Sequence, residues 1–142
     1  MSLSVLAIAA MSYLNTPYKW GGFDANGLDC SALIVKSFHN AGFYIQNMNS
    51  QQLYYWTQTL EGAKSCAPQE DCLIFYGKES DSITHVALAL NSQILIEAGG
   101  AGRDSLNLTR EQLLARDARV RIRPINHRSD IVASVKVPID RL

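Results

Sequence analysis

Residues 17–35 read P-Y-K-W-G-G-F-D-A-N-G-L-D-C-S-A-L-I-V, an aromatic, glycine-rich loop that leads directly into an apolar helical run. Asp29 is a favourable N-cap residue, which predicts that Cys30 lies in the first turn of a helix. The free N–H groups and the dipole at a helix N-terminus stabilise a thiolate. The stretch therefore indicates a candidate nucleophile at Cys30. The alternative is structural, because free cysteine is usually a small buried hydrophobe.

The composition is that of an ordinary globular domain. The chain has 142 residues, of which 47% are hydrophobic and 18% charged, and we expect a single domain over residues 1–142 with one core. Thirteen basic residues balance thirteen acidic ones, so the charge gives no reason to expect a nucleic acid partner. Five arginines cluster late in the chain, and we interpret them as a solvated strand face: Arg116, Arg119, Arg121, Arg123 and Arg128.

The N-terminal run does not have the pattern of a signal peptide or a membrane anchor. Met1–Met11 carries no Lys or Arg before its short apolar part. Residues 5–14 instead fit an amphipathic helix that ends before Pro17. No stretch reaches the length of a transmembrane helix, so we expect no membrane insertion.

The cysteines and histidines do not suggest a metal site. Cys66 and Cys72 can pair across a short loop, leaving Cys30 free, but such a bond needs an oxidising compartment, and the pairing stays open. No C-x-x-C occurs, and no histidine has ligand spacing relative to the cysteines. We expect neither a metal nor an organic cofactor.

Helical patterns precede strand patterns along the chain. Helices are expected over 4–14, from Cys30 to about Gly42, over 50–60, and from a capping box at Thr109 to about Ala118. Strands are expected over 72–76, 84–90, 93–97, 120–125 and 131–137. This order favours an α+β domain with N-terminal helices packed on a central antiparallel sheet.

A hairpin places a carboxylate near a histidine. If the chain turns at residues 91–92, facing residue numbers sum to about 183, which brings Glu97 close to His85. A carboxylate can orient an imidazole and favour the imidazolium that pairs with a thiolate. The bland interpretation is that His85 is a structural residue at a strand end.

The other two histidines are weaker candidates. His39 lies on the same helix as Cys30, about 13 Å along the axis at about 1.5 Å rise per residue. His127 lies in a polar loop and has no strand partner that the sequence identifies. His85 is therefore the preferred partner of Cys30.

These residues carry a family resemblance. The blocks Y-K-W-G-G, G-L-D-C-S-A-L-I-V, L-I-F-Y and T-H-V-A-L-A-L, in this order, resemble the NlpC family of papain-fold cell-wall cysteine peptidases over about residues 5–98. The resemblance implies hydrolysis of peptidoglycan stem peptides, typically between D-γ-glutamate and diaminopimelate or lysine. It implies that Cys30 is the nucleophile and His85 the general base. It also implies that Tyr18, Asp29 and Ser31 line the stem-peptide pocket, with Tyr18 supporting the tetrahedral intermediate.

We add Trp20, from the aromatic loop, as a candidate substrate contact. The third catalytic position of the family is most often His, sometimes Asn or Gln, whereas this chain has Glu97, which we interpret as a variant Cys-His-Glu triad. Asn47 and Asn49 replace the frequent Arg and Ser before the third helix, and Ala32 replaces the Gly after D-C-S. The last segment, R-S-D-I-V-A-S-V-K-V-P, faintly resembles phage-encoded members.

Two other functions stay open at this stage. The same fold could serve an amidase or acyltransferase, or a catalytically idle binding or assembly module. In all cases the chain as given is expected to be made in the cytoplasm. A wall hydrolase would then reach the wall after export, injection or lysis.

Overall fold

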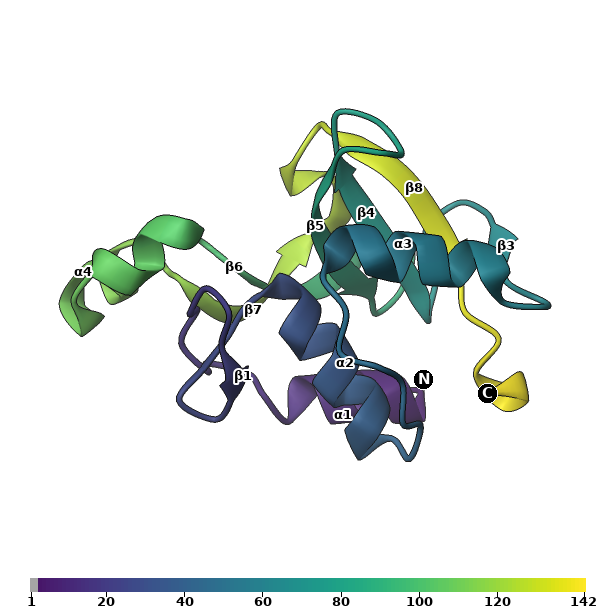
Figure 1. Cartoon of the computed structure of the whole chain (residues 1–142), viewed down its shortest axis with the longest axis horizontal. Helices are drawn as coiled ribbons and strands as arrows, with labels where there is room; N and C mark the ends of the chain where they lie inside the picture. The colour runs from purple at the N-terminus through teal and green to yellow at the C-terminus, as the bar shows by residue number, and fades with distance from the viewer. Residues whose placement is uncertain (1–2) are drawn as a thin grey trace.

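The computed structural model describes residues 3–142, in which three helices lie against a six-stranded antiparallel sheet (Figure 1). The helices are α1 Val5–Met11, α2 Cys30–Asn40 and α3 Ser50–Thr59. The sheet has the order β3-β8-β4-β5-β6-β7. Its strands are β3 Lys64–Ser65, β4 Cys72–Gly77, β5 Ile83–Ala89, β6 Ile94–Gly99, β7 Arg119–Pro124 and β8 Ile131–Lys136. The predicted α+β class, with N-terminal helices on an antiparallel sheet, is confirmed.

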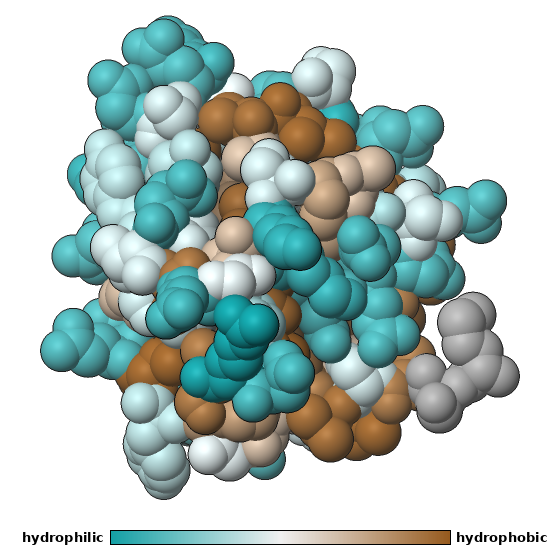
Figure 2. All heavy atoms as spheres, turned by 90° about the vertical axis from the view of Figure 1, so that its right-hand side faces the viewer, coloured by the Kyte–Doolittle hydropathy of each residue, from teal (hydrophilic) through white to brown (hydrophobic). Residues whose placement is uncertain are grey.

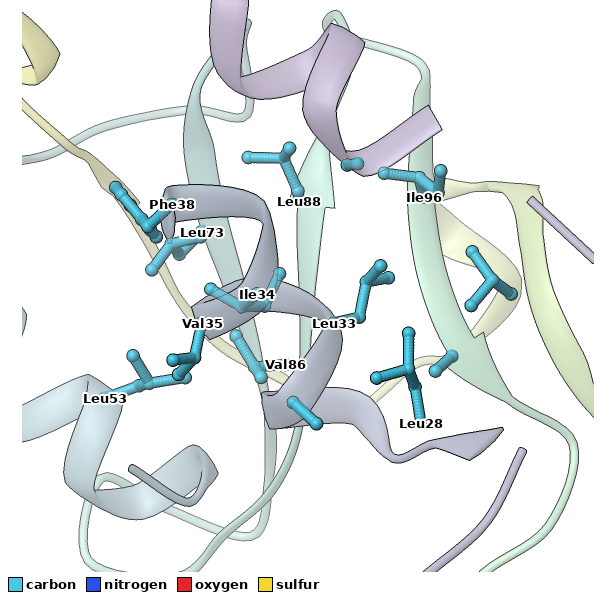
Figure 3. Packing of buried hydrophobic residues seen from close by; sticks show 14 of the residues in the cluster. Leu28, Leu33, Ile34, Val35, Phe38, Leu53, Leu73, Val86, Leu88 and Ile96 are labelled. Atoms are coloured by element: carbon cyan, nitrogen blue, oxygen red, sulfur yellow. The ribbon is translucent and has the colours of Figure 1, made fainter. Parts of the chain in front are cut away.

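Helix α2 is the centre of the core. Leu33, Val35 and Phe38 have no solvent exposure, and the helix packs against α1, α3, β5 and β6. Figure 3 shows its apolar side chains facing Leu88 and Ile96 of the sheet. A helix buried on several sides needs apolar residues all round, as the sequence indicated. This packing fixes the N-terminal end of α2, and with it Cys30, relative to the sheet.

Helix α1 is shorter than predicted and ends at Met11, whereas the prediction extended it to about residue 14. The hydroxyl of Ser12 donates to the carbonyl of Ala9 at 2.6 Å. Asn15 then takes a positive φ of 73°, which a helix cannot contain. The chain therefore turns before Pro17. Residues 1 and 2 of the N-terminal run lie outside the described residues.

The loop between α1 and α2 contains a small hairpin that the sequence did not predict, formed by β1 Phe23–Asp24 and β2 Gly27–Leu28. Gly21 has a φ of 73°, a conformation that favours glycine. At Gly22 an added Cβ would collide with the carbonyl oxygen of Gly27. The glycines thus let the loop fold back tightly in front of α2.

After β6, the chain continues through three short 3-10 helices and one α-helix. The 3-10 helices are η1 Arg103–Asn107, η2 Ile125–His127 and η3 Ile139–Arg141. Helix α4 Arg110–Ala115 begins with the predicted capping box of Thr109 and Gln112. It ends before the predicted residue 118, because Asp117 takes a φ of 55°.

Apolar residues form separate patches between hydrophilic ones on the face shown in Figure 2. Within residues 3–142, no helix is both long and apolar enough to cross a bilayer.

Candidate active site

Cys30 is the first residue of α2, and Asp29 is the N-cap, as predicted. The Asp29 carboxylate accepts hydrogen bonds from the N–H of Ala32 at 2.9 Å and from the N–H of Gly21 at 3.0 Å. It also accepts one from the hydroxyl of Ser31 at 3.2 Å. The Asp29 side chain therefore caps the helix and links the glycine loop to it. The half-buried thiol of Cys30 lies in the first turn of this helix.

His85 lies on β5 and joins Cys30 to Glu97. Its Nε2 lies 2.7 Å from Oε1 of Glu97, which leaves Nδ1 for Cys30. Burial by itself lowers the pKa of His85. Hydrogen bonds to Cys30 and Glu97 and the charges of both outweigh that effect and raise the pKa from 6.5 to about 9. These interactions therefore favour the imidazolium form of His85.

The register of the β5–β6 hairpin differs by one residue from the prediction, and the difference matters. Leu88 faces Ile96 and Ala89 faces Leu95, so facing numbers sum to 184. Position 85 then falls opposite 99, and Glu97 is its diagonal neighbour on the same face. The predicted sum of 183 would have turned Glu97 to the opposite face from His85, since a one-residue slip inverts every side chain.

Glu97 is 1% exposed and has two further partners that the sequence did not identify. Arg121 of β7 contacts Oε2 through Nε at 3.1 Å and Nη2 at 3.0 Å. His127 of η2 brings Nε2 to 3.2 Å from Oε1. Burial raises the pKa of Glu97, but His85, His127 and Arg121 together overcome it and lower the pKa from 4.5 to about 2. Glu97 is thus held as a buried carboxylate.

The interpretation of the late arginines as a solvated face is wrong for β7. Arg121 is buried, and Arg119 and Arg123 bind the Asp117 carboxylate at 2.6 and 3.2 Å. The alternation of arginine at 119, 121 and 123 was a signal that one strand face carries all three. The sequence could not show that Glu97 is the partner of Arg121, because that contact depends on β7 pairing with β6.

Two of the candidate substrate contacts, Tyr18 and Trp20, differ in exposure. Tyr18 is 4% exposed. Burial raises the pKa of its phenol, and the negative charges of Cys30, Asp29 and Asp104 raise it further. The Tyr18 side chain is therefore a neutral phenol, and the Cys30 thiol is among the groups near it. Trp20 is 43% exposed, with the Arg103 guanidinium 5.4 Å from its ring centroid.

Two small cavities flank the site. One of about 230 Å³ lies beside the N-terminus of α2 and is lined by Gly21, Gly22, Phe23, Asp29, Ser31, Ala32, Asn47, Met48, Asn49 and Gln52. The other, of about 150 Å³, is lined by His85, Glu97, Gly99, Gly100, Ala101, Arg121, His127 and Arg128. The first cavity therefore adjoins the helix N-terminus that carries Cys30, and the second lies against the cluster of His85, Glu97, Arg121 and His127.

The remaining cysteines lie away from the site. The Sγ atoms of Cys66 and Cys72 are 3.6 Å apart, and both are free thiols. In the part of the chain that the structure describes, no group of three or more His, Cys, Asp or Glu side chains could hold a metal ion.

Comparison with known proteins gives a family match. The profile of the NlpC/P60 family matches residues 15–122. A probable endopeptidase of Mycobacterium tuberculosis is 30% identical over 94 residues, which is 66% of this chain and 23% of that protein. LytE, a probable peptidoglycan endopeptidase of Bacillus subtilis, is 27% identical over 108 residues, 72% of this chain and 29% of LytE. The chain spans about a quarter of the length of these curated relatives.

Solved structures of this family share the fold. The peptidoglycan hydrolase RipB of Mycobacterium tuberculosis superposes with a TM-score of 0.66 at 23% identity, covering 94% of this chain and 62% of that one. RipD of the same organism gives a TM-score of 0.64 at 20% identity, covering 94% and 95%. RipD is described as a non-catalytic NlpC/p60 domain protein adapted to peptidoglycan binding. The fold by itself therefore does not decide between catalysis and binding.

Proposed function

The chain belongs to the NlpC/P60 family, and from this premise we propose that it is a cysteine peptidase that hydrolyses peptidoglycan stem peptides at the bond between D-γ-glutamate and diaminopimelate or lysine. The observation that carries the proposal is the line of Cys30, His85 and Glu97, with His85 Nε2 2.7 Å from the carboxylate. A thiol, an imidazole and a carboxylate that contact one another in this order are the groups that a thiol peptidase uses.

The proposed first step is attack of the Cys30 thiolate on the scissile carbonyl. His85 holds the proton as an imidazolium and gives it to the leaving amine, so that a thioester to Cys30 remains. The N–H groups in the first turn of α2, that of Cys30 included, face the oxyanion of the tetrahedral intermediate. The neutral Tyr18 hydroxyl is a further donor to it.

The second step is hydrolysis of the thioester. His85, now neutral, takes a proton from water, which attacks the acyl carbon and releases the new carboxyl group and the thiol. Glu97 keeps the ring oriented through both steps, in the way that a carboxylate supports the imidazole of a catalytic triad. No other reactant than water is needed.

Digestion of purified peptidoglycan tests this function. The wild-type chain should release fragments whose masses identify the scissile bond, and Cys30→Ala should release none. Cys30→Ala removes only the sulfur atom of a half-buried side chain, so binding to the wall should survive in it. Equal release by both proteins would remove Cys30 from the mechanism. Binding without release by either would place the chain with the non-catalytic members.

The same digest separates the amidase or acyltransferase alternative. Fragments cut at a bond other than D-γ-glutamyl would keep the nucleophile and change the substrate. The phage origin suggested by the last segment stays a prediction.

A further inference from the structure

The Glu97 carboxylate has more basic partners than a Cys-His-Glu triad requires. His85 comes from β5, Arg121 from β7 and His127 from η2, and all three reach a side chain that is 1% exposed. Only the contact with His85 takes part in the proposed reaction. The other two need a separate explanation, because burying a charged group without function is costly.

The partners of Glu97 contact different oxygens of its carboxylate. Arg121 places both Nε and Nη2 on Oε2, at 3.1 and 3.0 Å, whereas both histidines contact Oε1. Glu97 and Arg121 are direct Cα partners in the β6–β7 ladder, so the arginine is held opposite the carboxylate. The last torsion of a glutamate side chain is otherwise broad. We propose that Arg121 and His127 are positioning residues that fix the Glu97 carboxylate with Oε1 turned towards His85.

This inference rests on the proposed function, and the charges of the active pair explain the need for it. In the reactive form, Cys30 and Glu97 are anions and His85 is the one cation between them. Arg121 supplies a second positive charge, next to the buried Glu97 carboxylate, so that two cations balance the two anions. It is itself anchored, because its Nη1 donates to the carbonyl of Asp117 at 3.0 Å.

His127 contributes through both ring nitrogens. Nδ1 donates to the carbonyl of Pro124 at 3.0 Å, and Nε2 faces Oε1 of Glu97 at 3.2 Å. The ring is therefore held between a backbone carbonyl of its own segment and the carboxylate of Glu97. The Tyr76 ring lies against both histidines, with centroids 5.5 Å from His85 and 5.9 Å from His127. The other charged groups around this cluster are Asp117, Arg123, Arg128 and Asp130.

Gly99 is independent evidence that the Glu97–Arg121 pair is closely packed against the strand. It lies two residues after Glu97, on the same strand face. A Cβ at this position would lie 2.7 Å from Oε2 of Glu97 and 3.1 Å from Nη2 of Arg121. The backbone there is not left-handed, so the clash with the ion pair is the reason for glycine.

A double-mutant cycle tests the proposal, with the rate of Cys30 alkylation by iodoacetamide at pH 7 as the readout. Peptide mass mapping separates Cys30 from the other cysteines. Arg121→Met and His127→Ala should each lower the rate about tenfold, a coupling of ordinary size for residues in contact. In a Glu97→Gln background neither should lower it further, because both act through the carboxylate. Equal losses in both backgrounds would overturn the proposal.

Two further proteins, and the double variant of the cycle, make the result decisive. Arg123→Met, on the same strand face but bound to Asp117, is the matched control and should stay within about twofold of wild type. Gly99→Ala keeps every charge and should still slow alkylation, since it displaces the pair. The double variant of Glu97→Gln and Arg121→Met removes both charges of the buried pair, so it keeps the test decisive even if Arg121→Met alone is too unstable to assay. Its rate must equal that of Glu97→Gln, and a lower rate refutes the proposal.

Turnover of a stem tetrapeptide, measured on the same proteins, separates the two hypotheses. If the losses in alkylation rate depend on Glu97 but no peptide is released, the proposed substrate is refuted and the positioning roles remain intact. Peptide release with additive losses would refute the positioning roles alone. In the supporting case, kcat falls with the alkylation rate and KM is unchanged, because Arg121 and His127 lie behind His85.

Discussion

Replacement of Glu97 by glutamine removes one negative charge and almost no volume. The carboxylate lies 2.7 Å from Nε2 of His85, and the amide oxygen can still accept a hydrogen bond there. What is lost is the charge that favours the imidazolium. The His85 pKa is raised, so the imidazolium and the stability it provides are fully present below about pH 6.5 and lost as pH rises through about 9.

The size of the effect follows from the two pKa values. The rise from 6.5 to about 9 in His85 corresponds to about 3 kcal/mol in favour of the cation. Cys30 and Glu97 share this contribution. If Glu97 supplies about half, its loss lowers the pKa of His85 by about one to two pH units. Glu97 itself is ionised down to about pH 2, so the wild-type effect is constant across neutral pH.

The assay is the rate of Cys30 alkylation, and of stem-peptide hydrolysis, from pH 5 to pH 10. The wild-type rate of hydrolysis should fall with a midpoint near pH 9. In Glu97→Gln that midpoint should move down by about one to two pH units, with kcat about 10–100-fold lower at its maximum. Glu111→Gln, an exposed substitution of the same kind in α4, should behave as wild type. An unchanged midpoint in Glu97→Gln would refute the assigned role of the carboxylate.

Three further predictions concern stability. Phe38→Ala empties a fully buried site between α2 and the Trp56 ring and should lower the free energy of unfolding by about 3–5 kcal/mol in urea; a loss below about 1 kcal/mol would contradict the described core. Asp29→Ala removes the α2 cap and the tie to the glycine loop and should cost about 1–2 kcal/mol, whereas an unchanged urea midpoint would show that the cap is dispensable. Oxidation with a thiol–disulfide pair should join Cys66 and Cys72, whose sulfurs are 3.6 Å apart, and raise stability by about 2 kcal/mol; a mass without the loss of two hydrogens would exclude the bond.

The fold class and the elements of the core followed from local patterns. The short apolar runs at 84–90 and 93–97, separated by the turn residues Asn91 and Ser92, marked the central hairpin, and the apolar density after Cys30 marked the buried helix. Such signals are contained in a window of a few residues. Ends of elements were less accurate, as in α1 and α4, because they were decided by single residues with positive φ, Asn15 and Asp117.

Sequence by itself determined which chemistry was available. It placed Cys30 behind an N-cap, identified His85 as the preferred imidazole, and brought Glu97 near it, because all three depend on local signals and one short turn. Tertiary structure decided what holds the carboxylate. Arg121 and His127 come from segments 24 and 30 residues away from Glu97 along the chain, through strand pairing and a loop that no short window contains. The structure also decided the register of the β5–β6 hairpin, one residue away from the prediction, because the exact length of the turn sets the face of every side chain.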